Sequence, residues 1–444
     1  MAWVTPAGHA SLHTRGMTKN KHTSSPYECH ITRGHTSRFY GHQITSNFGE
    51  ITMDKASAAA RRASRMRNCI SVAVNATMSV VVLAGCSSSG GSKSQTGTSG
   101  ASTVGNTSST AANVAEAKSL MAKYEAPMTA FSLPPLKSAP PRGKKIALVY
   151  NNIPGSIDIL HGAEEAVQAL GWTSIPIIYD PTTPTGLQEA YAQAVRDNPD
   201  GVIAWSVDET AYAQAAKQFA AKHIPVVEGV TADAVTPPVI ANVNNADQIA
   251  LAGRLTAAYV IAQKGADANV AVFNVRSFSI LVAYETAFKT EYLRLCPSCK
   301  YKSVSVQGAD IGTKVPAQVV STIQTDPKIN FAVMGFGNIS LGVSAALHSA
   351  GVSGVKVVGE APTTPNISSV LNGSEDMWVG FPIRGMGWTV MDALARYFNN
   401  ESTAIDTTAP TPFQILTKAN APNPAAQPEV VSYQALFKQL WHVG

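Results

Sequence analysis

Cys296 and Cys299 form a Cys-Pro-Ser-Cys sequence, which has the spacing of dithiol redox sites. Such a site needs its first thiol at the N-terminus of a helix, where the thiol pKa is lowered. Here the pair follows an expected helix at 280–295 and precedes an expected strand at 301–306. Two cysteines are also too few for a zinc site. The pattern therefore favours a structural clip on a helix-to-strand turn over redox chemistry.

A second pattern with chemical meaning is Gly335-Phe336-Gly337, which follows an expected strand at 331–334. Glu360 ends the next expected strand, so the two together imitate a dinucleotide-binding fingerprint with its ribose-binding acid. The third glycine of the fingerprint is absent, because Ser340 and Leu341 stand there. A nicotinamide-dependent oxidoreductase is therefore an alternative that rests on a partial motif.

A third pattern is centred on Cys86. Four arginines between positions 61 and 67 precede an apolar run at 70–84 that is short and interrupted for a membrane span. The run ends in Leu83-Ala84-Gly85-Cys86, which resembles a bacterial lipoprotein signal, in which the cysteine thiol receives the lipid. An ordinary signal peptide with an incidental Cys86 is the alternative. We expect residues 1–85 to be a leader, an upstream extension followed by the signal peptide.

Export would change how the other cysteines and the charge are interpreted. Cleavage before Cys86 leaves Cys296 and Cys299 as the remaining pair, and an exported location is oxidising, so we expect a disulfide between them.

Residues 1–85 hold 10 basic and 3 acidic side chains, whereas the rest of the sequence holds 24 and 26. The net charge of +5 therefore belongs to the leader, and a nucleic-acid partner loses its electrostatic argument.

Short apolar runs alternate with amphipathic helical stretches from about 144 to the end of the sequence. This alternation predicts α/β architecture, with parallel sheets covered on both faces by helices. Two similar series of elements meet near Asp267, which predicts two lobes. In the first series we expect strands at 146–150, 175–178, 202–205, 226–228 and 239–243, and helices at 157–170, 187–197, 211–222 and 246–264. In the second we expect strands at 270–273, 301–306, 331–334 and 355–359, and helices at 280–295, 315–325 and 339–350.

The expected domain plan follows from these series. Residues 86–143 form a flexible tether rich in Ser, Gly and Thr, with a short helix at 114–124 and a proline-rich segment at 134–142. The first lobe comprises 144–267 with about 381–402, and the second comprises 268–380. Residues 403–444 supply the last hinge crossing and a closing strand and helix. The last elements, at 377–381, 386–398, 413–416 and 433–441, are expected to return to the first lobe.

Several short motifs follow one another in a specific order. They are Lys145-Ile-Ala-Leu-Val-Tyr150, Gly162-Ala163-Glu164, Leu170-Gly171-Trp172, Asp200-Gly201-Val202-Ile203, Ile224-Pro225-Val226-Val227, Gly253-Arg254, Gly342 and Val357-Val358-Gly359. Over roughly 144–420, their order and spacing resemble the sugar-type family of type I periplasmic binding proteins, the solute receptors of ABC importers. The resemblance implies two Rossmann-like, doubly wound lobes with three hinge crossings, near Asp267, Gly380 and 402–410. It also implies a ligand held between the carboxyl ends of the two sheets.

The resemblance further implies which residues bind the ligand. Receptors for hexoses and pentoses place Asp, Arg and Asn at the strand ends and sandwich the sugar ring between aromatic side chains. Several of these polar positions are apolar or aromatic here, so a larger, less polar or partly aromatic solute is expected in place of a simple pentose. The corresponding ligand-binding residues are Asn151, Asn152, Trp205, Ser206, Glu228, Arg276, Tyr284, Phe336, Glu360 and Phe381.

Some of these residues also have purely structural interpretations. Trp205 could cap a strand in the core, Arg276 and Glu360 could pair with each other, and Phe336 and Phe381 could pack in the core or the hinge. Which interpretation holds depends on the positions of their side chains.

The resemblance implies a monomeric receptor that needs no catalytic residue, metal or cofactor. Lipid on Cys86 would hold it at the outer face of the bacterial cytoplasmic membrane, where a permease recognises the closed lobes. The sequence contains no Walker A motif, so the ATPase would be a separate chain. A lipoprotein that presents its ligand to a membrane sensor is an alternative. A transcription regulator with the same fold would need a helix-turn-helix headpiece and a cytoplasmic address, which the leader contradicts.

Overall fold

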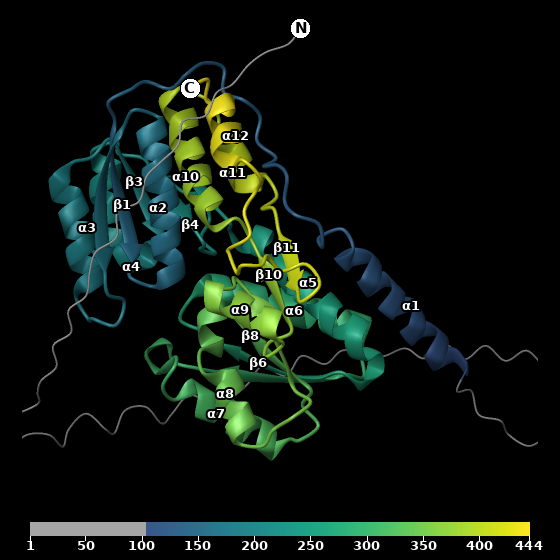
Figure 1. The fold of residues 1–444 in the computed structure, drawn as a ribbon. Coiled ribbons are helices and arrows are strands. Elements are labelled where there is room, and N and C mark those ends of the chain that lie inside the picture. Colours follow the sequence, from purple (N-terminus) through teal and green to yellow (C-terminus); the bar gives the residue numbers. More distant parts are fainter. Residues whose placement is uncertain (1–103) are drawn as a thin grey trace, which may run out of the picture. The chain divides into compact units, whose positions relative to one another are not determined.

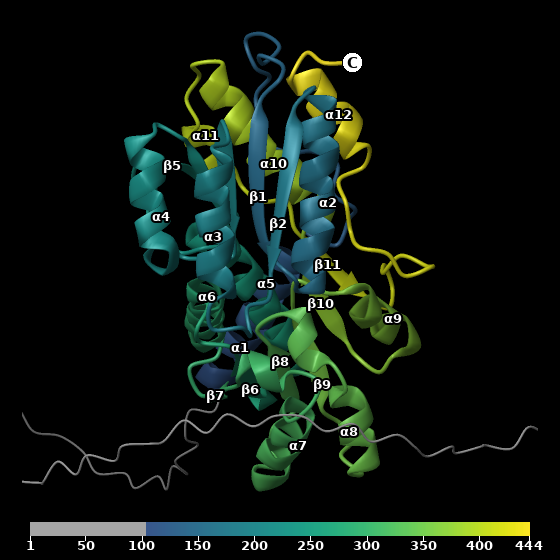
Figure 2. The same cartoon turned by 90° about the vertical axis from the view of Figure 1, so that its left-hand side faces the viewer.

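The computed structural model describes residues 104–444, in which two sheets form the frame (Figure 1). The first sheet has five parallel strands in the order β2-β1-β3-β4-β5. Figure 2 shows β1 and β2 between helices α2 and α3. The strands are β1 (Lys145–Asn151), β2 (Thr173–Tyr179), β3 (Gly201–Trp205), β4 (Val226–Gly229) and β5 (Val239–Val243). The helices between them are α2 (Pro154–Ala169), α3 (Gly186–Asp197) and α4 (Glu209–Ala221).

The second sheet has six strands in the order β11-β10-β9-β8-β6-β7, and only the β10–β11 pair is antiparallel. We call each sheet with the helices that pack on it a lobe. The strands are β6 (Asn269–Asn274), β7 (Lys300–Ser305), β8 (Phe331–Met334), β9 (Lys356–Glu360), β10 (Met377–Gly380) and β11 (Gln414–Thr417). The helices of this region are α5 (Ala246–Lys264), α6 (Ser279–Leu295), α7 (Val315–Thr325), α8 (Val343–Ser349) and α9 (Thr364–Asn372).

The central strands are apolar because helices cover both faces of each sheet. Every residue of β3, β6 and β8 is buried, and in β1 only Lys145 at the start is exposed. This burial explains why continuous apolar runs, and not alternating ones, mark these strands in the sequence. The prediction of parallel α/β architecture is confirmed by the pairing of the strands.

The first connection between the lobes lies at 244–245, not at Asp267. Helix α5 follows β5 directly and already packs against α6, β9 and β10 of the second lobe. Its amphipathic sequence predicts a helix correctly, but the sequence does not show which lobe the helix covers. The second connection follows Gly380 as expected, because α10 (Ile383–Phe398) packs against α2, β4 and β5. The third follows α11 (Ala404–Thr408), which contacts β5, and leads into β11.

The prediction that all the last elements return to the first lobe is wrong for two strands. β10 and β11 pair with each other in the second sheet. Only α10 and α12 (Tyr433–Leu440) lie with the first lobe, where α12 packs against α10. The chain therefore passes between the lobes once more after β11, a crossing that the sequence did not indicate.

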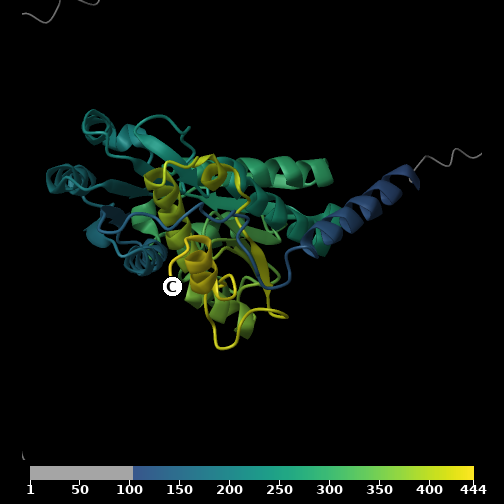
Figure 3. The ribbon, with the colours of Figure 1, turned by 90° about the horizontal axis from the view of Figure 1, so that it is seen from above.

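The segment before β1 is not a flexible tether over its described part. Helix α1 (Val104–Met121) begins well before the expected helix at 114–124 and packs beside α5 (Figure 3). The Asn113 amide donates to the Leu295 carbonyl at 2.8 Å, and Glu116 pairs with Arg294 at 2.7 Å. These contacts hold α1 on the second lobe at the end of α6.

Residues 122–143 then run from the second lobe to the first. The Ile415 amide donates to the Tyr124 carbonyl at 2.7 Å, and farther along the Leu136 amide donates to the Leu440 carbonyl at 2.9 Å. Leu133 and Leu136 are buried, so this segment belongs to the folded core despite its prolines.

Two further predictions differ from the structure in the second lobe. The expected helix at 339–350 is broken, because Gly342 has a φ of 79° and separates the 3-10 helix η3 (Gly337–Ser340) from α8. Helix α9 was not predicted at all. Its N-terminal turn is closed by a capping box between Thr363 and Asn366, a signal that is readable in the sequence but short.

Cys296 and Cys299 are joined by a disulfide that closes the turn between α6 and β7. Cys296 lies at the C-terminal end of α6, not at a helix N-terminus. The pair therefore lacks the environment that would lower a thiol pKa. Cys86 and the leader lie outside the described residues. Among residues 104–444, no helix is long and apolar enough to cross a membrane, and no cluster of three metal-ligating acidic, His or Cys side chains occurs.

Candidate functional site

A cavity of about 110 Å³ lies where the carboxyl ends of the two sheets meet. For scale, an apolar cavity of about 150 Å³ holds one benzene molecule, so this cavity is smaller than that, and the expected larger solute would have to extend into the adjoining cleft or open the lobes. In parallel sheets the loops and helix N-termini that follow the strands converge at this edge, which is why ligands bind there. The cavity is lined by Asn151, Ile153, Gly155, Ser156, Ile159, Trp205, Ser206, Val230 and Asn244 from the first lobe and the connection after β5. The other lining residues are Ile249, Phe278, Ile280, Leu281, Phe336, Asn338, Glu360, Ala361, Pro362, Thr363, Phe381 and Ile383.

The first lobe contributes a fixed aromatic wall. Trp205, at the end of β3, is only 1% exposed and stacks on Tyr150 with ring centroids 5.7 Å apart. Gly229 at the end of β4 lies against the indole, and a Cβ atom at this glycine would overlap the Trp205 ring. Trp205 is therefore both a core residue and a lining residue, so its two interpretations are compatible.

Asn244 supplies a polar group from the connection between the lobes. Its side chain is fully buried, and its Oδ1 accepts a hydrogen bond from the Thr411 hydroxyl at 3.1 Å. The Nδ2 group has no partner in the structure. A buried donor without a partner costs about 1–3 kcal/mol, so a ligand acceptor that reached this amide would offset that cost.

Glu360 supplies the corresponding group from the second lobe. It ends β9, is only 3% exposed, and its Oε2 has no hydrogen-bond partner. Burial raises the pKa of Glu360 to about 8, because the charged form is poorly solvated. No other lining residue is acidic, basic or otherwise titratable. At neutral pH this carboxyl is therefore mostly protonated in the ligand-free protein.

Two phenylalanines close the second-lobe side. Phe336 follows β8 and is half-buried, and Phe381 follows β10 and packs edge-to-face on Phe413 with ring centroids 6.3 Å apart. Phe381 also lies in the second connection between the lobes. Six of the ten predicted binding residues are thus brought together around one cavity: Asn151, Trp205, Ser206, Phe336, Glu360 and Phe381.

The other four predicted binding residues do not line the cavity. Asn152 is exposed beyond β1, and Glu228 is buried beneath the surface of the first lobe, where it accepts a hydrogen bond from the Tyr212 hydroxyl at 2.5 Å. Burial raises the Glu228 pKa to about 7. Strand-end position alone could not distinguish such inward-facing groups from cavity-lining ones.

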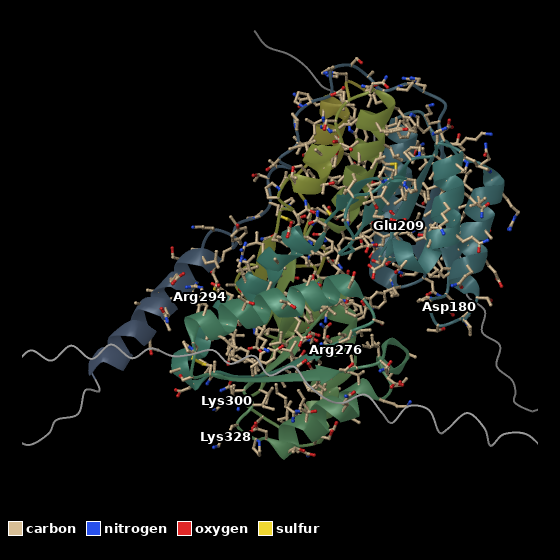
Figure 4. All side chains as sticks on the ribbon, turned by 180° about the vertical axis from the view of Figure 1, so that it is seen from behind. Asp180, Glu209, Arg276, Arg294, Lys300 and Lys328 are labelled. Carbon is tan, nitrogen blue, oxygen red and sulfur yellow. A yellow bond between two sulfur atoms is a disulfide. The ribbon has the colours of Figure 1, made fainter. Side chains whose placement is uncertain are left out.

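Tyr284 and Arg276 have structural partners in the second lobe. The Tyr284 hydroxyl donates to Thr256 at 3.1 Å and is fully buried between α6 and α5. Arg276, labelled in Figure 4, pairs with Glu285 at 3.0 Å and not with Glu360, and its side chain is 46% exposed. The suggested Arg276–Glu360 pair is therefore wrong, and Glu360 has no ionic partner among the described residues.

Sequence reasoning missed Asn244 and Phe278. Asn244 has a φ of 56°, a conformation that asparagine adopts more readily than most residues, at the point where the chain leaves the first lobe. Phe278 precedes the first turn of α6, and no local pattern separates it from a core aromatic. Only the sheet order shows that both positions face the same cavity.

The glycines of the partial dinucleotide fingerprint serve packing. The strand β8 leads into the short 3-10 helix η3, not into an α-helix whose N-terminus could bind a pyrophosphate. A Cβ atom at Gly335 would overlap the Asn274 side chain, and one at Gly337 would overlap Asn366. The glycines are therefore explained by close contacts within the second lobe.

Comparison with known families decides how the chain is classified. The family model described as a periplasmic binding protein domain matches residues 146–402, more than half of the chain. The chain belongs to the periplasmic binding protein family. Membership implies a location outside the cytoplasm. None of the curated proteins matches the sequence.

Solved structures of periplasmic binding proteins share this fold. An ABC transporter solute-binding protein from Agrobacterium vitis, bound to α-D-tagatopyranose, is 21% identical with a TM-score of 0.57, over 64% of this chain and 97% of its own. GanP, a glucose-galactose binding protein from Geobacillus stearothermophilus, is 16% identical with a TM-score of 0.57, over 64% and 100%. A periplasmic ribose ABC transporter protein from Conexibacter woesei is 17% identical with a TM-score of 0.55, over 64% and 95%.

Proposed function

We propose that this periplasmic binding protein is a receptor that captures a small solute and delivers it to an ABC importer. The observation that carries the proposal is the cavity, which takes its lining from strand ends of both sheets. The chain joins the lobes through connecting segments, and Ser279 of the second lobe also forms hydrogen bonds with Asp208 and the Ala232 amide of the first. The titles of the similar structures name sugar-binding ABC transporter proteins, which supports the transport role.

The mechanism requires binding and closure but no chemical step. A solute first contacts one lobe, and closure of the second lobe completes the site and removes water. The solute favours the closed state only by the difference between its affinities for the closed and open states. The connections after β5, after β10 and after α11 would act as the hinge, and residues 122–143 and the crossing after β11 would have to move with them. The permease would then recognise the closed pair of lobes, and a separate ATPase chain would supply the energy.

The solute is less polar than a monosaccharide. Sugar recognition needs several hydrogen-bonding side chains because each buried hydroxyl without a partner is costly. The cavity has mostly aliphatic and aromatic walls. Its polar lining consists of amides, hydroxyls and one carboxyl, and Glu360 and Asn244 hold the buried atoms without a partner. A ligand with an apolar body and few polar groups fits this lining.

A thermal-shift screen tests the receptor function directly. A ligand that binds only the folded protein raises its stability by RT ln(1 + [L]/Kd), about 2.7 kcal/mol at a hundredfold excess over Kd. Small apolar and aromatic solutes should raise the melting temperature, while D-ribose and D-galactose should not. Turnover of a bound compound, or no stabilisation by any solute class, would contradict the proposal.

The anchoring part of the proposal concerns Cys86, whose thiol would carry the lipid after cleavage of the leader. Replacing it by Cys86→Ser should move the protein from the membrane fraction of producing cells to the soluble exported fraction. A Cys296→Ser/Cys299→Ser double variant is the matched control, because it removes thiols that lie in the folded domain. Unchanged membrane retention of Cys86→Ser would show that the lipid assignment is wrong.

A further inference from the structure

The unpartnered polar atoms of the cavity come from opposite lobes. Glu360 Oε2 lies at the end of β9 in the second lobe, and Asn244 Nδ2 lies where the chain leaves the first lobe. Both side chains are at least nine-tenths buried and both line the cavity. A solute that satisfies both must offer one group to a carboxyl and a hydrogen-bond acceptor to an amide.

We propose that the solute is an organic cation, an ammonium group on an apolar body, whose positive charge lies beside Glu360 and whose oxygen acceptor reaches Asn244. This inference rests on the proposed receptor function and specifies the charge of its solute.

The side chains around Glu360 favour a positive partner over a negative one. Among the lining residues the cavity holds one carboxyl and no Lys, Arg or His. An anionic solute would therefore meet no compensating charge and would face a carboxyl. A cation supplies the ionic partner that Glu360 lacks, and a buried charge is stable only when it is paired.

The aromatic walls suit the apolar surface of such a cation. Trp205, Phe278, Phe336 and Phe381 all line the cavity. Cations are attracted to the faces of aromatic rings, and this attraction reaches about 2 kcal/mol when the site excludes water. A sugar-binding site also uses aromatic rings and amides, and this cavity does hold Asn151, Asn244 and Asn338, but it lacks the Asp and Arg side chains that such sites place at the strand ends.

The neighbouring cleft has the same sign of charge. It shares Ser206, Val230 and Phe278 with the cavity, and Asp208 is the only charged side chain that lines it. Ser279 donates a hydrogen bond to the Asp208 carboxylate at 2.5 Å, which connects the two lobes at this rim. A cation that approaches through this cleft meets only negative charge, which favours its entry.

No other charged group takes the place of the solute at Glu360. Strands β8 and β10 and the helix η3, which contact β9, carry no titratable side chain. On α5, Asp247, Arg254 and Lys264 are exposed, and Tyr259 lies near Lys356 at the opposite end of β9. On α6, Tyr284 interacts with Glu360, but its hydroxyl donates to Thr256.

The test compares cations with neutral molecules of the same shape. Choline is paired with its uncharged carbon isostere dimethylbutanol, and phenethylamine is paired with phenethyl alcohol. Isothermal titration of the intact chain should show that each cation binds at least tenfold more tightly than its neutral partner. Binding an ammonium group ionises Glu360, so close to one proton should be released per solute at pH 6.5. Because the Glu360 pKa is raised to about 8, affinity should rise by at least about tenfold between pH 6 and pH 8.

Glu360→Gln isolates the carboxyl without removing its volume. This variant should lose at least about 30-fold in affinity for the cations, together with the proton release and the pH dependence. Glu375→Gln is the matched control, because Glu375 is another buried carboxyl of the second lobe that bonds to Trp378 and Asn366 and does not line the cavity. It should bind the cations as the unchanged protein does.

Two results would overturn the inference, and they can be told apart. If neutral partners or sugars bind as tightly as the cations without proton release, the receptor function stands and the inference about charge fails. If none of these probes binds to the folded protein, the inference about charge fails. The receptor function fails as well only if the wider thermal-shift screen finds no stabilising solute.

Discussion

Phe336 and Trp205 both line the cavity, but their burial makes them different subjects for substitution. Trp205 is 1% exposed, stacks on Tyr150 and packs on Gly229. Removing a buried aromatic ring of this kind costs about 3–5 kcal/mol of stability, so loss of binding in Trp205→Ala would be mixed with unfolding. Phe336 is half-buried after β8 and offers the cleaner experiment.

Phe336→Ala should weaken solute binding about tenfold, because it removes one aromatic wall of the cavity, while the melting temperature changes little. Titration with a cation from the matched pairs measures the affinity, and calorimetry measures the stability. Phe398→Ala is the control, since this equally half-buried ring packs on Trp172 at the far end of α10. Equal effects of the two substitutions on affinity would remove Phe336 from the site.

Helices α2 and α10 approach each other so closely that glycine is required on both. A Cβ atom at Gly162 would overlap the Arg384 carbonyl, and one at Gly387 would overlap the backbone of Ala163. This contact holds α10, which follows the second connection between the lobes, on the first lobe.

Gly387→Ala should therefore lower the free energy of unfolding by about 1–3 kcal/mol, the usual cost of overpacking, although alanine is the better helix former. Urea unfolding measures the difference. Gly308→Ala is the control, because a Cβ atom there meets no neighbour within 4 Å and its φ is not positive. If Gly387→Ala had a higher free energy of unfolding than the unchanged protein, α2 and α10 would be able to move apart without loss of stability, which would contradict this prediction.

Local pattern predicted the elements well where a strand is buried on both faces. The expected strands at 239–243 and 331–334 coincide with β5 and β8, because a short, continuous apolar run between turn residues is typical of a strand covered on both sides. The break at Gly342 and the placement of α5 on the second lobe were missed. Both depend on contacts between segments that are distant in the sequence.

The residues around the cavity were also predictable only in part, because their positions depend on both the strand ends and the packing of distant segments. Trp205, Glu360 and Phe381 could be placed at the cavity because parallel strands bring their last residues to one edge of the sheet. Tyr284 and Glu228 do not line the cavity, since the side-chain directions that bury them depend on Thr256 and Tyr212 across the packing interface. The ends of the strands predict which residues lie at the edge of the sheet. Which of those side chains line the cavity is decided by the packing of the folded protein.

At the scale of the whole molecule, buried carboxyls set the response to pH. Burial raises the pKa of Glu360 to about 8 and that of Glu228 to about 7, whereas an unfolded glutamate titrates near 4.5. Between these values the folded state binds more protons than the unfolded state, so stability falls as pH rises. Hydrogen bonds lower the pKa of Glu165 and Glu285, and their contribution is lost in acid, as pH falls below about 4.5.

The ligand-free protein should therefore be most stable near pH 5 to 6 and should melt several degrees lower at pH 8. Calorimetry across this range measures the trend. Glu360→Gln should reduce the difference between pH 6 and pH 8, because its amide does not ionise. A melting temperature that rises toward pH 8 would contradict the assignment of raised pKa values.

The C-terminal segment completes the first lobe although the family match ends at residue 402. Trp441 is fully buried, stacks on Trp388 at 5.2 Å, and donates its indole N–H to Asp392 at 2.6 Å. Trp441→Ala should lower the free energy of unfolding by about 3–5 kcal/mol. The substitution leaves a cavity in the core, and it removes the indole N–H that donates a hydrogen bond to the Asp392 carboxylate. Val431→Ala, at a side chain that is 60% exposed in the same segment, should change stability by less than about 0.5 kcal/mol. If urea unfolding shows similar small effects for both, the C-terminal segment is an appendage to the lobe and not part of its core.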